Sequence, residues 1–427
     1  MKYTIFWFRR DLRLEDNVGL LVALETGKPV IPLFIFDSDI LDNLPENDAR
    51  VNFIYDTLSE INEKLKGYGS SLLVKHGKQV DVWKHLISDY DIDKVYTNKD
   101  YEPYARKRDG AVRDLLQEKG TTFERFKDQV IFEERDVLKN DGKPYTVFTP
   151  YKNKWLEHFE GIDASPKQLP GNPTFIQQAF NFPSLKQIGF EESKIKVRPY
   201  DLSELDEYAE KRNLPADDAT SYLSPHLRFG TVSVRQIIKK LKPSQGVFLS
   251  ELIWREFFMQ ILYHFPKVVE NNFHAKYDGI KWRNDKNEFD KWCQGKTGYP
   301  MVDAGMRQLN ATGYMHNRVR MVVASFLCKH LLIDWRWGEA YFAEKLLDYD
   351  LSANNGNWQW AAGTGCDAAP YFRVFNPSEQ LKKFDKDLKY TKKWVPELEK
   401  SNYPTPMVDH KMARERALEA YKNGIAS

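Results

Sequence analysis

The fold class is decided by Thr4-Ile-Phe-Trp-Phe8, a short apolar run followed by a helical pattern at Asn17–Glu25 and by a second run, Val30-Ile-Pro-Leu-Phe-Ile-Phe36. Short, nearly continuous apolar runs are typical of strands that are buried on both faces of a parallel sheet. Alternating strands and helices predict an α/β domain with a doubly wound, Rossmann-like parallel sheet. The alternation continues with expected strands at Ser71–Lys75 and Lys94–Asn98 and expected helices at Val51–Lys66, Val80–Asp89 and Ala105–Lys119.

The common phosphate-binding signatures are missing from the sequence. No G-x-G-x-x-G follows the first expected strand, and no Walker-type loop occurs anywhere. We therefore expect the architecture of a nucleotide-binding domain without its usual phosphate loop.

The length of the chain predicts more than one domain, because 427 residues exceed the roughly 250–300 that a single core usually supports. The α/β domain is expected at residues 1–132. Residues 133–189 break both periodicities and hold six prolines, which predicts a connector. Residues 190–427 show mainly helical patterns and are expected to form an all-α domain.

The composition is that of an ordinary globular protein, with 42% hydrophobic residues and a formal net charge of +2. Cys293, Cys328 and Cys366 show no C-x-x-C spacing, which argues against a zinc site or a disulfide framework and fits a reducing cytoplasm. No metal is expected. The start of the chain lacks a signal-peptide pattern and no apolar run approaches about 18 residues, so no membrane span is predicted.

The most unusual segment is DYDLSANNGNWQW, residues 348–360, which has helical character. In a helix Asp350, Asn354 and Trp358 would share one face. A carboxylate, an amide and an indole on one face suit a polar heteroaromatic ligand better than plain core packing, since buried polar groups need partners. The alternative is a partly exposed helix with incidental tryptophans.

Hydroxyl groups gather in TSYLSP, residues 220–225. Ser224 is expected to be a helix N-cap, with Pro225 at the first helical position. Together with Thr220 and Ser221 it would suit phosphate oxygens. Simple helix capping is the alternative.

A third group of side chains would suit a nucleic-acid base. Glu251, Trp254 and Arg255 occupy neighbouring helical positions, where an indole can stack on a base and a carboxylate can accept from its edge. A surface ion pair over a buried tryptophan is the alternative. Farther along, Arg318 and Arg320 point to opposite sides of a helix and are expected to have different partners.

These motifs resemble those of the photolyase/cryptochrome flavoproteins, in particular the bacterial class I cyclobutane pyrimidine dimer photolyases. The resemblance runs through almost the whole chain in colinear order. The blocks are FRRDLRLEDN (residues 8–17), TSYLSPHL (220–227), ELIWREF (251–257), GKTGYPMVDAGMRQL (295–309), NNGNWQW (354–360) and AAPYFRVFNP (368–377).

The resemblance implies that the helical domain binds FAD, with the adenine folded back toward the isoalloxazine ring. Asn354 matches the position beside flavin N5. An amide there offers no readily released proton, unlike the aspartate of plant cryptochromes, and so favours repair over signalling. The cofactor-binding residues implied are Tyr208, Thr220, Ser221, Tyr222, Leu223, Ser224, Arg255, Arg320, Asp348, Tyr349, Asp350 and Asn354.

Three tryptophans match the electron-transfer chain of this family. Trp358 would lie nearest the flavin, Trp335 between, and Trp282 at the surface. With Glu251 and Asn354, they are the residues expected to take part in the reaction.

The resemblance also implies that a cyclobutane pyrimidine dimer in DNA is flipped out of the duplex and split by an electron from the photoexcited, reduced flavin. Trp254 and Trp360 would form an aromatic wedge, and Glu251 would bond a thymine edge. The DNA- and lesion-binding residues implied are Glu251, Trp254, Asn317, Arg318, Met321, Trp360, Arg373 and Gln380.

Some positions depart from the family pattern. Asn317 stands where the (6-4) lesion enzymes carry a second histidine, which argues against that substrate. Ala105 stands at the position of the folate-binding acid, and Val269 and Glu270 stand where relatives carry a Cys-Lys pair, so a folate antenna is not expected. A deazaflavin, a second flavin or no antenna chromophore in the N-terminal domain all stay open.

Three functions follow as hypotheses. The favoured one is light-dependent DNA repair by a monomeric, cytoplasmic deoxyribodipyrimidine photo-lyase. The second is a cryptochrome-type blue-light sensor without repair activity, and the third is a nucleic-acid-binding flavoprotein that keeps the cavity as a structural remnant.

Overall fold

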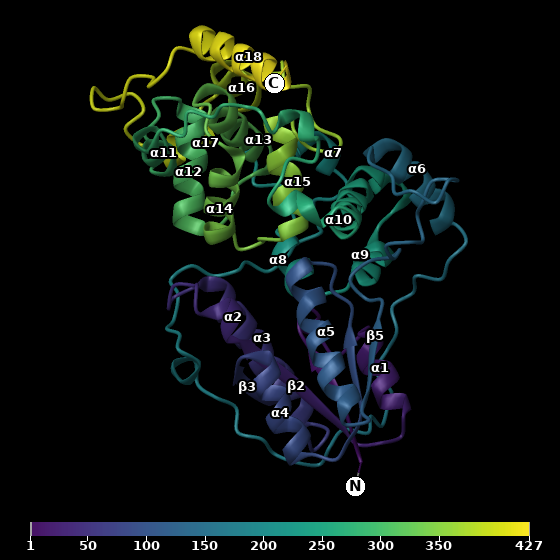
Figure 1. The fold of residues 1–427 in the computed structure, drawn as a ribbon. Helices are drawn as coiled ribbons and strands as arrows, with labels where there is room; N and C mark the ends of the chain where they lie inside the picture. Colours follow the sequence, from purple (N-terminus) through teal and green to yellow (C-terminus); the bar gives the residue numbers. More distant parts are fainter. Residues whose placement is uncertain (1, 427) are drawn as a thin grey trace. The chain divides into compact units, whose positions relative to one another are not determined.

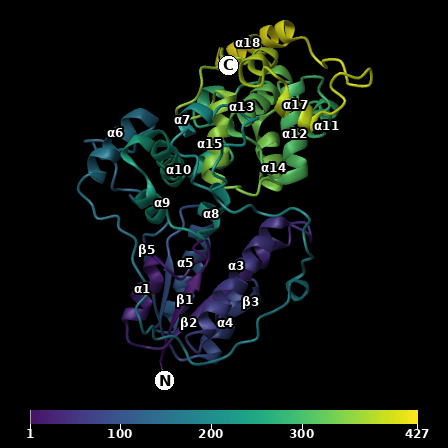
Figure 2. The ribbon, with the colours of Figure 1, turned by 180° about the vertical axis from the view of Figure 1, so that it is seen from behind.

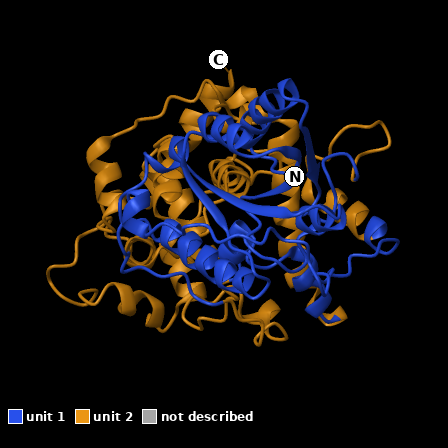
Figure 3. Ribbon diagram, turned by 90° about the horizontal axis from the view of Figure 1, so that it is seen from below, with its two compact units in different colours: residues 1–136, 157–199, 223–242 blue, residues 137–156, 200–222, 243–427 orange. Residues whose placement is uncertain are grey.

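Two compact units make up the computed structural model, which describes residues 2–426 (Figure 3). The first unit comprises the residues up to 136 together with 157–199 and 223–242. The second comprises 137–156, 200–222 and the residues from 243 onward. Because the two units alternate along the chain, the domain limits expected at residues 132 and 189 stay a prediction.

The first unit is built on a five-stranded parallel sheet with the order β3-β2-β1-β4-β5. The central strands β1 and β2 are buried on both faces, which accounts for their continuous apolar runs. β5 is an addition to the four expected strands; its sequence TFERF is charged and only partly buried, as an edge strand allows. The strands are β1 (Tyr3–Phe8), β2 (Val30–Asp37), β3 (Leu73–Gly77), β4 (Ile92–Asn98) and β5 (Thr122–Phe126).

Helices cover both faces of this sheet (Figures 1 and 2). Phe6 and Phe8 of β1 pack with residues of α1 and α3, whereas Ile5 and Trp7 pack with residues of α4 and α5. The doubly wound arrangement expected from the sequence is therefore confirmed. The helices of this unit are α1 (Val18–Glu25), α2 (Ser38–Leu41), α3 (Ala49–Lys66), α4 (Gln79–Asp89), α5 (Pro103–Glu118), α8 (Ser224–Phe229) and α9 (Val234–Lys240), with a 3-10 turn at Leu185–Ile188.

A buried ion network explains much of the charged motif that follows β1. Arg13 bonds Asp128 at 2.6 and 2.7 Å, and Arg235 of α9 bonds Asp128 at 2.7 Å and Asp16 at 3.0 Å. Burial alone would raise the pKa of Asp128, but the two guanidinium groups outweigh it and hold the pKa below its usual value. The motif therefore ties the loop after β1 to α9.

The second unit is helical, as expected. Its largest apolar cluster joins residues of α11 to α15, with Trp292, Trp335 and Trp358 among the buried side chains. The helices are α7 (Tyr208–Lys211), α10 (Gly246–His264), α11 (Lys286–Cys293), α12 (Pro300–Thr312), α13 (Asn317–Ser325), α14 (Trp335–Lys345), α15 (Leu351–Ala362), α16 (Pro377–Phe384), α17 (Lys389–Trp394) and α18 (His410–Ala426), with 3-10 turns at Pro243–Gln245, Pro266–Val269 and Ala275–Tyr277 and a π-helical turn at Phe326–His330.

Helix α6 (Phe148–Phe159) lies within the expected connector, so the expectation that this segment has no helical periodicity is wrong for these residues. Phe148, Tyr151 and Trp155 are buried and spaced by three and four residues, which is the spacing of one helix face. The prolines of the segment hide this pattern, although Pro150 lies in the first turn, where proline is tolerated.

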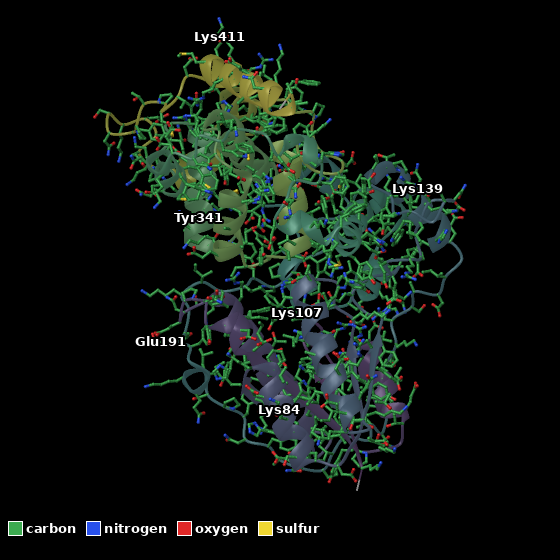
Figure 4. The ribbon with its side chains drawn as sticks, viewed as in Figure 1. Lys84, Lys107, Lys139, Glu191, Tyr341 and Lys411 are labelled. Atoms are coloured by element: carbon green, nitrogen blue, oxygen red, sulfur yellow. The ribbon has the colours of Figure 1, made fainter. Side chains whose placement is uncertain are left out.

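Exposed charged side chains are spread over both units. Lys84 of α4 and Lys411 of α18 are examples, and both point to solvent (Figure 4). Among residues 2–426, no helix combines the length and the apolar character needed to cross a membrane.

Candidate functional site

The segment 348–360 is a loop followed by a helix. α15 begins at Leu351, because the side chain of Asp350 accepts hydrogen bonds from the amides of Ser352 and Ala353 at 3.1 and 3.2 Å. The expectation that all thirteen residues are helical is therefore wrong for 348–350. Asp350 is the N-cap of α15, while Asn354 and Trp358 lie within the helix.

Asp348 has a cationic partner. Nη2 of Arg320 on α13 lies 3.2 and 2.9 Å from the two carboxylate oxygens of Asp348. Tyr349, between the two aspartates, is half-buried. The ion pair fixes the loop that leads into α15.

Asn354 is oriented by a neighbouring helix. Its Nδ2 donates to the backbone oxygen and to Oε1 of Glu339 on α14, at 3.1 and 2.8 Å. Burial raises the pKa of the Glu339 carboxyl, although the bond from Asn354 opposes the shift. The amide is thus held in one position by α14, a contact that the local sequence does not suggest.

The three tryptophans of the expected electron-transfer chain belong to one apolar cluster. Trp358 and Trp335 are buried, and Trp282 is half-buried against Tyr421, with ring centroids 5.8 Å apart. Nε1 of Trp335 donates to Oδ1 of Asn272 at 2.9 Å, which fixes the orientation of that indole.

Glu251 pairs with an arginine that no sequence motif marks. Nη1 of Arg212 donates to Oε1 of Glu251 at 2.6 Å, and its guanidinium lies 5.4 Å from the ring centroid of Tyr208. Burial and the charge of Glu251 raise the pKa of Tyr208 to about 12. Arg212 is the C-cap of the short helix α7 and follows Lys211 in the sequence, so only tertiary packing shows which of these cations meets Glu251.

Trp254 is half-buried in a stack of aromatic rings on α10 and α6. The Phe148 ring lies parallel to the indole at 3.6 Å and 8°, and Phe258 packs against it at 5.4 Å and 29°. Phe148 is not among the site residues expected from the sequence. The spacing of the aromatic residues in α6 could have shown that it lies on a buried helix face. Arg255 is half-buried beside Trp254.

Positive charge gathers around Arg318. Nη2 of Arg318 donates to Oδ1 of Asn213 at 2.6 Å, and its guanidinium lies 4.4 Å from the ring centroid of Phe384. Burial, Arg212 and Arg373 together lower the pKa of Arg318. Cations that repel one another in this way create a local site for anions such as phosphate.

The remaining expected DNA-binding residues differ in exposure. Asn317, the first residue of α13, is exposed, whereas Met321 and Trp360 are half-buried. Oε1 of Gln380 is buried without a hydrogen-bond partner in the described part of the chain. A buried acceptor without a partner suits a polar ligand.

Two comparisons of sequence identify the family. The FAD binding domain of DNA photolyase matches residues 248–402, and the DNA photolyase family matches residues 4–172. A deoxyribodipyrimidine photo-lyase of Halobacterium salinarum is 37% identical, with 98% of each chain covered. The chain belongs to the photolyase/cryptochrome family.

Solved structures of photolyases are similar over the whole chain. A bacterial class III photolyase from Agrobacterium tumefaciens gives a TM-score of 0.88 at 36% identity, covering 100% of this chain and 98% of the other. An archaeal photolyase from Sulfolobus tokodaii, solved with two FAD molecules, gives 0.86 at 37% identity, covering 99% and 100%. The fold expected from the sequence is thus that of the photolyase/cryptochrome family.

The loop before α8 has a strained backbone at two residues. Asp218 and Tyr222 adopt the left-handed conformation, with φ of 48° and 51°, and the Tyr222 hydroxyl bonds Oδ1 of Asp218. A non-glycine residue in this region costs of the order of 1–3 kcal/mol, and such strain is concentrated at functional sites. Thr220 and Ser221 lie between them, both half-buried.

Ser224 does not cap α8, so that expectation is wrong. The helix begins at Ser224 itself, the N-cap position is taken by Leu223, and no side chain makes a capping bond. Leu223 and Ser224 belong to the first unit, whereas the other expected cofactor-binding residues lie in the second.

The residues present fit the FAD of the photolyase/cryptochrome family. The strained loop offers two hydroxyls suited to phosphate, Arg320 offers a guanidinium beside Asp348, and Asn354 offers an oriented amide. Hydroxyls, a guanidinium and an amide are the kinds of group that bind the phosphates and the ring edge of a flavin dinucleotide.

Proposed function

We propose that the protein is a deoxyribodipyrimidine photo-lyase that uses FAD and light to split cyclobutane pyrimidine dimers in DNA. The supporting observation is that two packed helices carry the two halves of the site. α10 carries Glu251 and Trp254, which suit a base, and α15 carries Asn354 and Trp358, which suit a flavin. Gly356 brings these helices close together, since a Cβ there would lie 2.2 Å from Cδ1 of Phe258.

The cofactor supplies the electron for splitting: when bound, reduced FAD gives an electron to the dimer under blue or near-ultraviolet light. The protein supplies binding, orientation and tuning. Asn354, held by Glu339, would offer the flavin ring a hydrogen bond without a readily released proton. Trp358, Trp335 and Trp282 would carry an electron inward from the surface to the cofactor.

The protein also prepares the lesion. Trp254 and Trp360 offer surfaces on which an extruded base stacks, and Glu251 accepts a hydrogen bond from its edge. Arg318 and Arg373 hold the phosphates that flank the lesion. Asn317, Met321 and Gln380 complete the DNA-binding surface in this proposal.

The remaining cofactor-binding residues are assigned by the same reasoning. Asp348, Tyr349 and Asp350 would hold the ring and the ribose, and Arg255 and Arg320 would also contact the cofactor. The residues that would hold the phosphates and the ribityl chain are Tyr208, Thr220, Ser221, Tyr222, Leu223 and Ser224.

The proposal extends to an antenna chromophore and to the cellular setting. The Sulfolobus tokodaii photolyase holds two FAD molecules, which favours a second flavin over a folate in the N-terminal unit.

The free thiols of Cys293, Cys328 and Cys366 suit a reducing cytoplasm. We expect the protein to act there as a monomer.

A repair assay in light and darkness tests the function. Photoreduced protein should restore thymine dimers in an oligonucleotide under blue light and not in darkness. Flavin photoreduction without repair would instead indicate a light sensor. Tight lesion binding with no effect of light would indicate a DNA-binding flavoprotein that lacks the reaction.

A further inference from the structure

The indole of Trp254 is held in place by a residue outside the expected site. The ring of Phe148 is parallel to it, with centroids only 3.6 Å apart. A parallel contact this close covers one face of the indole. Trp254 remains half-buried, so the surface left for a base is the part that Phe148 and Phe258 do not cover.

Phe148 is itself fixed by polar contacts. It is 7% exposed, and its backbone amide donates to Oδ2 of Asp367 at 2.9 Å. Farther along α6, Nε1 of Trp155 donates to Oε1 of Glu256 at 2.8 Å, and this carboxylate is buried on α10. The start of α6 is therefore attached firmly to the helix that carries Trp254.

The second aromatic neighbour of Trp254 is equally constrained. Phe258 lies one turn farther along α10 and faces Gly356 of α15, where no side chain larger than hydrogen fits. The stack therefore runs from α6 through Trp254 to α15. Since each ring is fixed by its neighbours, the plane of the indole is set before any ligand arrives.

We propose that Phe148 is a positioning residue for lesion recognition, which holds Trp254 in the plane that receives the flipped base. The inference rests on the proposed function, because it assigns Trp254 to the lesion. A side chain that is already ordered saves the entropy that binding would otherwise cost. Phe148 acts through Trp254, so its removal should weaken binding and leave the light reaction intact.

The experiment compares Phe148→Leu, which removes the ring and keeps apolar bulk, with Phe148→Tyr, which keeps the ring. Phe182→Leu is the matched control, since Phe182 packs at 5.5 Å against Tyr55 in the first unit. The measurements, made on flavin-loaded protein in darkness, are the Kd for an oligonucleotide with one thymine dimer, the Kd for the undamaged oligonucleotide, and the flavin content. Repair per absorbed photon is then measured at saturating DNA.

Phe148→Leu should raise the Kd for dimer-containing DNA about three- to tenfold, the usual cost of ordering one side chain. Its Kd for undamaged DNA, its flavin content and its repair per photon should stay unchanged. Phe148→Tyr should restore lesion affinity to within about twofold, and Phe182→Leu should bind like the wild type.

Three results would overturn the inference while leaving the proposed function in place. One is an unchanged Kd for dimer-containing DNA in flavin-loaded Phe148→Leu. The others are a loss of affinity for dimer-containing DNA in Phe148→Tyr, or in Phe182→Leu, as large as the loss in Phe148→Leu. If Phe148→Leu fails to retain flavin, Phe148→Met takes its place under the same criteria. A wild-type protein with no preference for dimer-containing DNA would overturn the proposed function, and this inference with it.

Discussion

Single side chains in the helical unit are positioned by residues far away in the sequence. The amide of Asn354 is set by Glu339, and the carboxylate of Glu251 is set by Arg212. These partners carry no recognisable motif of their own. They nevertheless decide which hydrogen bonds remain for a ligand, because a group that already has one strong partner presents its remaining donors and acceptors in fixed directions.

Replacement of Trp358 by phenylalanine should abolish light-driven reduction of the flavin. Phenylalanine is harder to oxidise than tryptophan, so the first step of the expected electron-transfer chain would be lost. Repair by chemically reduced protein should persist. The measurement is flavin absorbance under blue light with an external reductant. The control is Trp394→Phe, because Trp394 is half-buried and does not belong to the expected electron-transfer chain. Equal loss of photoreduction and of repair by chemically reduced protein would contradict the role.

Replacement of Glu251 by glutamine should weaken lesion binding about tenfold, since a hydrogen bond to a charged acceptor is typically worth ~1.5–3 kcal/mol and this carboxylate is partly exposed. The Kd for dimer-containing DNA measures the effect. Glu379→Gln, at an exposed glutamate paired with Lys382, should leave the Kd unchanged. A Glu251→Gln protein with wild-type lesion affinity would remove Glu251 from the lesion site.

At the scale of elements, close helix contacts place the buried tryptophans. Gly338 of α14 lies against Trp358 of α15: a Cβ there would lie 2.1 Å from Cη2 of the indole. The absence of a side chain at this position therefore allows α14 and α15 to approach with the indole between them. The same approach lets Glu339 reach Asn354.

Gly338→Ala should accordingly destabilise the helical unit by ~1–3 kcal/mol through overpacking, and should also lower the yield of photoreduction by displacing Trp358. Urea unfolding and flavin photoreduction measure the two effects. Gly246→Ala is the control, because nothing lies within 4 Å of a Cβ at that position. If Gly338→Ala matched Gly246→Ala in stability, the packing argument would be refuted.

The elements themselves follow closely from local patterns. The expected strand at Thr4–Phe8 differs from β1 by one residue, and the one at Ser71–Lys75 is displaced by two residues from β3. Edge strand β5 and helix α6 are harder to predict. The first has no buried face that would give it an apolar run, and the second lies among prolines that suggest a loop.

At the scale of the whole molecule, a buried lysine joins three parts of the helical unit. Nζ of Lys329 donates to the backbone oxygens of Ala362 and Tyr371 at 2.7 and 3.1 Å, and lies 3.7 Å from the ring centroid of Tyr421 on α18. The Tyr421 hydroxyl donates to the same Ala362 oxygen at 2.6 Å. The C-terminal helix is therefore attached to the end of α15 through one shared carbonyl.

This arrangement predicts a pH-dependent stability. Burial lowers the pKa of Lys329 to about 7, from an ordinary value of 10.5. Between these pH values the unfolded chain binds more protons than the folded one, so the free energy of unfolding should rise with pH from about 7 to about 10.5. Below pH 7 both states are charged and the cost of burying the ammonium is at its maximum.

Urea unfolding of the wild type and of Lys329→Met at pH 7 and pH 9 measures this contribution. From pH 7 to pH 9 the free energy of unfolding of the wild type should rise relative to that of Lys329→Met. The contributions of other titrating groups cancel in this difference. Two parallel pH profiles would contradict the prediction, because they would show that Lys329 stays protonated in the folded protein at pH 9 and that its pKa is not lowered.

The sequence by itself determined the fold class, the helical nature of the second half and the family, because apolar periodicity and contiguous motifs are properties of neighbouring residues. Only the tertiary structure decided which side chains meet: Phe148 on Trp254, Arg212 on Glu251, and Glu339 on Asn354. Each of these contacts joins a helix to a different part of the fold. Its geometry depends on how whole elements pack, and no pattern within a single element encodes it.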